Sequence, residues 1–325
     1  MRIGKPLFSL LSLALISAPL APAYALDERP IDVVAVTWAG AGAAKVSVAD
    51  IQSTISSQVS PQWKRMTTFT GSAKDRSITF INGAALSSPI ALTQPMRCEG
   101  TGYANFASSI RSEAYKRLGI SDSKNRYLII LTPFAGCIWE GRATIGEYAP
   151  SGVTMTMQNS SSAFVITHEL GHALGAGHSN FLSCATGKSD GPWGSECSAV
   201  EYGGTMDVMG NVETTAPLST YHQWRMGLVT NSEVKQSWKS ETIELSSVEM
   251  GTGTRAIFMR DGKATYWVEY RKARPDSNYR SGLIIYRTDP PPISSIISPN
   301  PEDSAAEEFG NSVGTDIWVL NFDDY

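Results

Sequence analysis

Apolar positions in the first half of the chain follow the two periods of strands and helices. Three short apolar runs predict buried strands: residues 31–38, 77–81 and 126–133. Ser47 caps a helix predicted between the first two strands, which runs to Val59, and Pro61 marks a place where it can be interrupted. A second helix is predicted over residues 105–118, and Gly119 stops it. The alternation of strands and helices predicts a mixed α/β sheet.

From residue 231 onward the pattern changes to short β-like runs separated by turn residues. Five of these runs are predicted strands: residues 242–245, 255–259, 265–270, 282–287 and 316–322. Two proline-rich stretches, residues 289–292 and 298–302, are predicted loops. We therefore expect a β-rich C-terminal region over residues 231–325.

The composition is that of an ordinary globular protein, with 42% apolar and 18% charged residues among 325. A disordered chain would be poorer in apolar residues and richer in charge. The formal net charge of −4 shows no overall basic character of the kind typical of nucleic-acid-binding proteins, so we expect no nucleic-acid partner. No long uncharged apolar run occurs beyond the N-terminus, so we expect no membrane span in the mature chain.

Residues 1–25 have the pattern of a secretory signal peptide. Arg2 and Lys5 precede a short apolar core over residues 7–16, and Ala23-Tyr-Ala25 matches the small-x-small cleavage pattern. An uncleaved membrane anchor is the alternative, but the apolar core is short for a span. We therefore predict cleavage near Ala25 and a secreted protein, extracellular or periplasmic.

Secretion changes how the four cysteines are interpreted, because disulfides form in oxidising compartments. Cys98, Cys137, Cys184 and Cys197 allow three pairings. We favour Cys98–Cys137 and Cys184–Cys197, since the second pair closes a short loop rich in Gly and Ser. A cysteine metal site is disfavoured because no C-x-x-C spacing occurs.

The segment around residues 168–178 has the spacing of a zinc site. His168 and His172 are four residues apart, so on a helix both imidazoles lie on one face and can meet one metal ion. The preceding serines, residues 160–162, can cap that helix, and Gly175 can end it. His178 can then return to the ion as a third ligand.

Three neutral imidazoles leave one position of a tetrahedral zinc ion open for water, which is the catalytic arrangement. Glu169, beside the first ligand, can take a proton from that water and later give it to a leaving amine. One alternative is a helix with chance histidines, but three of the four histidines of the chain lie in this window. Another alternative is zinc without catalysis, against which Glu169 argues because a structural site needs no base.

The motif resembles the metzincin zinc signature, His-Glu-x-x-His-x-x-Gly-x-x-His. Metzincins also have a Met-turn, which residues 202–210 resemble. The resemblance implies Met209 beneath the ligands, with Met206 as a second candidate, because Asp-Val-Met-Gly is similar to the gametolysin-type turn. It implies an α/β (α+β) catalytic domain with a mixed sheet and an active-site helix, expected over residues 26–230 and followed by the β-rich region.

Residues 136–146 and 221–228 also resemble gametolysin-like peptidases, the second only in part. Some metzincins have a tyrosine two residues after the turn methionine, where it can stabilise the oxyanion. This chain has Asn211 there. The developing charge would then be stabilised by zinc, or by Tyr202 or Tyr221.

Three further features suggest chemistry that we do not adopt. His222 is expected to be a hydrogen-bonded helix residue rather than a ligand. Residues 95–100 faintly resemble a cysteine switch, but Cys98 on zinc would leave an odd thiol in a secreted protein. Calcium is unsupported, because neither Asp261-Gly262 nor the acidic stretch 302–308 has EF-hand spacing.

The sequence therefore predicts a secreted zinc-dependent endopeptidase that hydrolyses extracellular proteins or glycoproteins, with water activated by zinc and Glu169 as general base. Residues 142–157 are expected to include a strand at the rim of the cleft, whose free edge can pair with an extended substrate. The alternative is a zinc-containing adhesion or glycan- or protein-binding module that uses the β-rich region and has weak or no peptidase activity.

Overall fold

The computed structural model describes most of the chain after the predicted signal peptide. The described residues are 27–69, 77–146, 152–210, 213, 216–275, 279–288, 296–297 and 317–319. The predictions for the signal peptide (residues 1–25), the two proline-rich loops, Asn211 and the acidic stretch 302–308 fall outside them.

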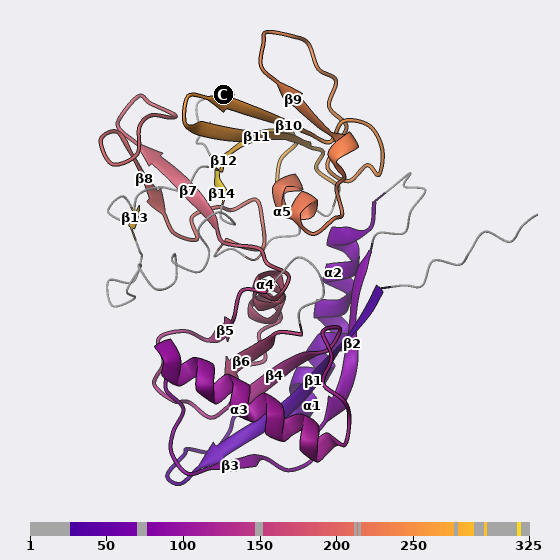
Figure 1. The fold of residues 1–325 in the computed structure, drawn as a ribbon, viewed down its shortest axis with the longest axis vertical. Coiled ribbons are helices and arrows are strands. Elements are labelled where there is room, and N and C mark those ends of the chain that lie inside the picture. Colours follow the sequence, from indigo (N-terminus) through magenta and orange to yellow (C-terminus); the bar gives the residue numbers. More distant parts are fainter. Residues whose placement is uncertain are drawn as a thin grey trace, which may run out of the picture.

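The N-terminal half forms a six-stranded mixed sheet, shown in the lower part of Figure 1. Its strands are β1 (Asp27–Trp38), β2 (Ile78–Ala85), β3 (Ile90–Leu92), β4 (Tyr127–Thr132), β5 (Gly141–Ala143) and β6 (Thr154–Gln158). The order is β2-β1-β4-β6-β5, with β3 paired to β1, and every pair except β5–β6 is parallel. The three strands predicted in this half are confirmed. Every residue of β4 is buried, which accounts for its unbroken apolar run.

The first predicted helix is longer than expected. Three helical segments follow one another directly: α1 (Val48–Thr54), the π-helical η1 (Ile55–Val59) and α2 (Ser60–Thr67). Ser47 and Asp50 form a capping box at its start. The interruption considered at Pro61 does not occur. The Ser60 N–H bonds to the Ile55 carbonyl in a π-type turn, so Pro61 enters the first turn of α2, where its missing N–H costs little.

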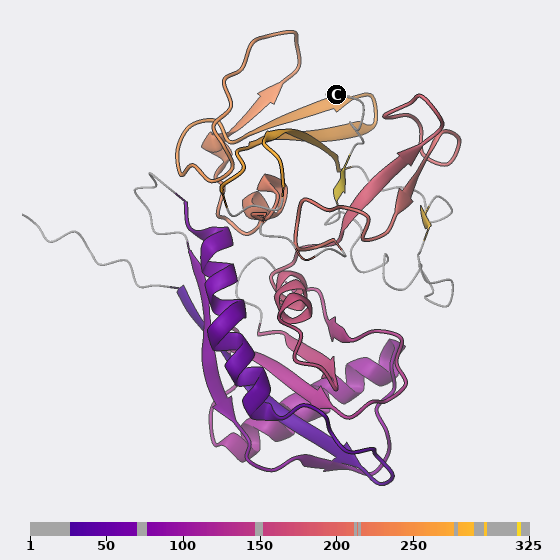
Figure 2. The same cartoon turned by 180° about the vertical axis from the view of Figure 1, so that it is seen from behind.

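Helices cover both faces of this sheet. The second predicted helix is α3 (Gly100–Leu118), and it ends as expected at Gly119, which has a φ of 66°. Ile110 of α3 packs with Val34, whereas Trp63 of α2 packs with Val33, so neighbouring residues of β1 point to opposite faces. α3 crosses the near face in Figure 1, and α1 and α2 lie in front in Figure 2. Across the described residues, no helix is long and apolar enough to cross a membrane.

The second sheet has eight strands in the order β13-β8-β7-β14-β12-β11-β10-β9. They are β7 (Ser179–Cys184), β8 (Cys197–Val200), β9 (Val234–Ser237), β10 (Ala256–Asp261), β11 (Ala264–Arg271), β12 (Gly282–Arg287), β13 (Ile296–Ile297) and β14 (Ile317–Val319). The β-rich C-terminal pattern is thereby confirmed. The strand predicted over residues 242–245 is wrong: that segment is irregular, and β9 takes the edge position beside β10.

This larger sheet takes strands from both sides of residue 230, because β7 and β8 precede that position. The short helices α5 (Thr220–Arg225) and η2 (Asn231–Glu233) connect the two parts. A further contact joins the halves: the Arg255 guanidinium lies 4.1 Å from the ring centre of Phe69, which follows α2. The predicted domain boundary at residue 230 stays a prediction, but it does not coincide with an edge of the sheet.

Both favoured disulfides are present. Cys98 and Cys137 tie the start of α3 to the loop before β5, and Cys184 and Cys197 join β7 to β8. We expect the purified protein to take up no alkylating label when it is denatured without reduction, because all four thiols are in disulfides. Mass measurement before and after reduction tests this. Label on Cys98 without reduction would contradict the pairing and favour the cysteine-switch alternative.

Candidate metal centre

The helix α4 (Ala163–Ala173) lies between the two sheets and carries the first half of the candidate site (Figure 1). It begins at Ser162, whose hydroxyl accepts a hydrogen bond from the Val165 N–H, as the sequence predicts. It ends at Leu174, and Gly175 then adopts a φ of 88°, a conformation that glycine tolerates well. The chain turns back there and delivers His178 directly before β7.

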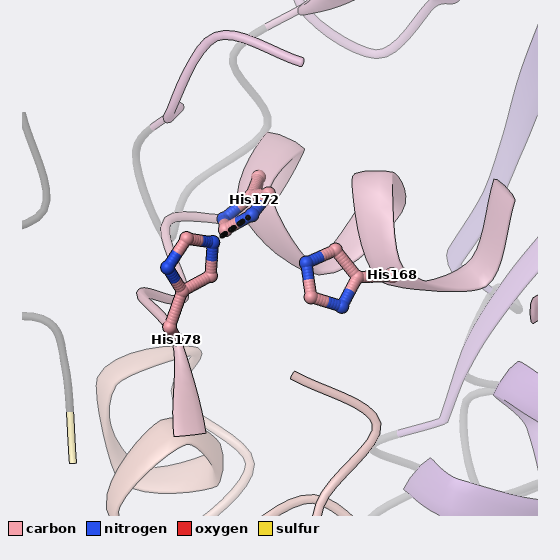
Figure 3. Close-up of side chains that lie close together, drawn as sticks. All are labelled: His168, His172 and His178. Carbon is pink, nitrogen blue, oxygen red and sulfur yellow. Dashed lines mark hydrogen bonds between the residues drawn. The ribbon is translucent and has the colours of Figure 1, made fainter. Parts of the chain in front are cut away.

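Three buried histidines converge beside α4. His168, His172 and His178 are only 8%, 7% and 2% exposed, and the nitrogen atoms they offer all lie within 4.8 Å of one another. The Nε2 atoms of His172 and His178 are 3.0 Å apart. Figure 3 shows His178 approaching His172 from the segment after the helix. The structure therefore brings together the three predicted ligands in a cluster that could hold a metal ion.

The Nδ1 atom of each ring has an acceptor nearby. His168 Nδ1 lies 2.9 Å from the Val208 carbonyl, and His172 Nδ1 lies 2.9 Å from the Ala176 carbonyl. His178 Nδ1 lies 3.3 Å from a carboxylate oxygen of Glu201. A carbonyl oxygen only accepts, so the Nδ1 atoms of His168 and His172 carry the proton and their Nε2 lone pairs are left for a metal. This set of nitrogen donors fits zinc.

Burial keeps these imidazoles neutral, the form that binds a metal. It lowers the pKa of His168, and it lowers the pKa of His172 and His178 well below the ordinary 6.5. Repulsion from neighbouring imidazoles adds to this effect: His168 lowers the pKa of both His172 and His178, and so does His222.

This burial predicts acid sensitivity of the metal-free protein. Below about pH 6.5 the unfolded chain takes up protons that the folded imidazoles do not, so these histidines make the free energy of unfolding fall with decreasing pH. Above that pH they add no pH dependence. Urea unfolding at several pH values tests this, and His172→Gln should show a shallower dependence. An identical slope in the two proteins would contradict the prediction.

Glu169 is a residue of α4, is 6% exposed, and lies on the side of the helix that faces β5 of the six-stranded sheet. A Cβ atom placed on Gly141 of β5 would lie 2.4 Å from Val165 and 3.1 Å from Cγ of Glu169. The Gly146 N–H also donates to the His172 carbonyl over 2.9 Å. Among the described strands β5 pairs with β6 alone, so it is an edge strand that runs beside Glu169.

Met209 lies fully buried beneath α4. A Cβ atom on Gly171 would lie 2.1 Å from the Met209 sulfur, so the glycine between His168 and His172 makes room for this methionine. Met206 instead packs with the aromatic cluster of the second sheet. Of the two methionines, Met209 is therefore the one that packs against α4 at Gly171, and its role beneath the ligands stays a prediction.

Asp207 organises the turn that holds Met209. One carboxylate oxygen accepts from the Met209 N–H over 2.9 Å, and the other accepts from the Ser219 N–H over 2.6 Å. His222 Nδ1 lies 3.2 Å from that second oxygen. His222 thus lies in a buried hydrogen-bonded pair and outside the histidine cluster, as the sequence analysis expected.

Of the two tyrosines considered as oxyanion stabilisers, only Tyr202 lies beside the histidines. Its ring centre is 4.0 Å from that of His178. Tyr221 packs instead against Trp267, with ring centres 5.5 Å apart. Cys98 is held in its disulfide.

Two residues near the histidines were missed by the sequence analysis. Asp207 lies inside the stretch that resembles a Met-turn. Its carboxylate contacts Ser219 and His222, and these residues come close to Asp207 only in the tertiary fold. Glu201 follows β8 and meets His178 only because β7 and β8 pair as a hairpin. No local pattern marks either residue.

No family profile and no curated protein matches the chain. Several solved structures show limited similarity, among them the following two. One, a chaperone–substrate complex, matches at 15% identity over 50% of this chain, with a TM-score of 0.24, and the match spans a quarter of its length (25%). The other, wild type OgpA from Akkermansia muciniphila, matches at 11% identity over 81% of this chain and 84% of OgpA, with a TM-score of 0.29. At such low TM-scores neither structure bears on the chemistry of the histidine site.

Proposed function

We propose that the protein is a secreted zinc-dependent endopeptidase of the metzincin type that hydrolyses extracellular proteins or glycoproteins. The observation that carries the proposal is the convergence of three buried imidazoles around one point, with Glu169 next to the first of them in sequence. His168, His172 and His178 would hold the ion. When bound, zinc supplies Lewis acidity toward the scissile carbonyl and lowers the pKa of a water molecule.

The protein's own residues supply the proton transfers. Glu169 would take the proton of the attacking water and pass it to the leaving amine, because no other carboxylate belongs to the motif. Tyr202, which lies against His178, is the candidate for stabilising the oxyanion. Met209 would support the two helix ligands from below.

The edge strand β5 provides a place for an extended substrate. Its outer edge can pair with a peptide through backbone hydrogen bonds, as in strand addition. Gly141 brings the strand against α4 at Glu169, so a peptide paired along β5 would pass the general base. Recognition through the backbone accommodates many sequences, as expected of an endopeptidase.

Digestion of casein by the purified full-length protein tests the proposal. We expect cleavage that a chelator abolishes and that added zinc restores. Sites within the substrate chain, identified by mass spectrometry, would show endopeptidase action. Zinc binding without cleavage of casein or of a complex peptide library would contradict the peptidase and favour the zinc-containing binding module.

A further inference from the structure

The hairpin of β7 and β8 places a second group of side chains around His178. β7 starts at Ser179, directly after this histidine, and its antiparallel register with β8 runs from Phe181↔Val200 to Cys184↔Cys197. Just beyond that register, the side-chain oxygen of Asn180 accepts from the Tyr202 N–H over 2.9 Å. The same hairpin therefore fixes both the third histidine and the residues that follow β8.

Glu201 is the first of those residues, and its carboxylate faces the histidine. Its Oε1 atom lies 3.3 Å from His178 Nδ1, and the two side chains are 1% and 2% exposed. Burying a carboxylate away from water is costly unless another group compensates its charge. The corresponding Nδ1 atoms of His168 and His172 meet backbone carbonyls instead. His178 is thus the one member of the cluster whose Nδ1 faces a carboxyl side chain rather than a backbone carbonyl.

We propose that Glu201 is a positioning residue for the metal centre, acting through His178; this inference rests on the metal site of the proposed function. A carboxylate 3.3 Å from Nδ1 favours the imidazole tautomer with its proton on Nδ1, which leaves the Nε2 lone pair for the ion. An anionic partner also makes the imidazole a stronger donor than a carbonyl partner does. The Tyr202 ring also packs against His178, with ring centres 4.0 Å apart.

Zinc affinity of the full-length protein tests this role without relying on activity. The probe is Zn²⁺ alone, titrated into metal-free protein in competition with a chelating dye. We expect Glu201→Ala to bind zinc about 10- to 100-fold more weakly, the usual cost of losing such a partner. Glu201→Gln should fall between Ala and wild type, because its amide oxygen keeps a dipole near Nδ1 but carries no full charge.

Glu233→Gln is the matched control, since Glu233 is a buried carboxylate of similar exposure, 6%, that bonds Thr230 rather than a histidine. It should bind zinc with wild-type affinity. Near-UV circular dichroism of each metal-free variant verifies folding, and if Glu201→Ala fails to fold, the Gln variant decides the result.

Unchanged affinity in folded Glu201→Gln and Glu201→Ala would overturn the role of Glu201 and leave the metal site standing. An equal loss in Glu233→Gln would also overturn it, because the effect would then come from buried carboxylates in general. If the wild-type protein binds no zinc, the proposed function itself is contradicted, because it requires a zinc site.

Discussion

Glu169→Gln should retain zinc and lose peptide hydrolysis. Glutamine keeps the size and most of the packing of this buried side chain but cannot take up a proton. Since general acid–base catalysis contributes about 10²- to 10⁴-fold, turnover should fall by that factor or more. The zinc content should stay near one ion per chain, because the three histidines that form the cluster are unaltered. Turnover with casein and metal analysis of the same preparations measure both effects.

Glu196→Gln is the matched control for this experiment. Glu196 is a half-buried glutamate paired with Lys188 on the β7–β8 loop, outside the histidine cluster, so its replacement should leave turnover and zinc content unchanged. Wild-type turnover in Glu169→Gln with zinc still bound would contradict the proposed mechanism, although it would leave the metal site intact. Loss of zinc from this variant would instead indicate that Glu169 helps to hold the ion.

His172→Ala should lose most of its zinc and, with it, hydrolysis. His172 is central in the cluster: its ring centre lies 4.8 Å from that of His168 and 4.7 Å from that of His178. The variant would keep only two of the three imidazoles, which are too few protein ligands for a stable zinc site. Metal analysis after dialysis against a weak chelator measures the loss.

The double replacement of His168 and His172 controls for binding elsewhere in the molecule. We expect it to contain essentially no zinc under the same dialysis. Near-stoichiometric zinc in the double variant would show that the ion binds outside this cluster. Folding is verified by circular dichroism, since His172 also bonds the Ala176 carbonyl.

The β-rich region takes part in building the candidate site. Arg271 of β11 donates to the Met206 carbonyl just before Asp207 and Met209, and Glu269 of the same strand accepts from the Thr220 N–H over 2.6 Å. Arg271 and Glu269 are themselves paired over 2.6 Å, and both are fully buried. A buried ion pair is tolerated only when its polar atoms have hydrogen-bond partners. Met206 and Thr220, which precede the β-rich region in the sequence, supply such partners to Arg271 and Glu269. The larger sheet therefore supports the turn that carries Met209.

Several elements followed from the sequence because their determinants are local. The apolar run of β4, the capping box at Ser47 and the stop at Gly119 act within a few residues of one another. The spacing of His168 and His172 also fixed their common face, because a helix repeats every 3.6 residues. Gly175 then allowed the turn that returns His178 to them. The Gly- and Ser-rich loop favoured the Cys184–Cys197 disulfide and left Cys98–Cys137 as the other pair, and the structure contains both.

Other features depended on contacts between distant parts of the chain. The sequence by itself determined the histidine spacing, the central strand and the β-rich pattern after residue 231. Only the tertiary structure decided that Glu201 meets His178, that Gly141 brings an edge strand against Glu169, and that β7 and β8 join the later strands in one sheet. It also gave the edge position to β9 rather than to residues 242–245. The physical reason is that periodicity and capping depend on near neighbours, whereas strand pairing and burial depend on which distant segments pack together.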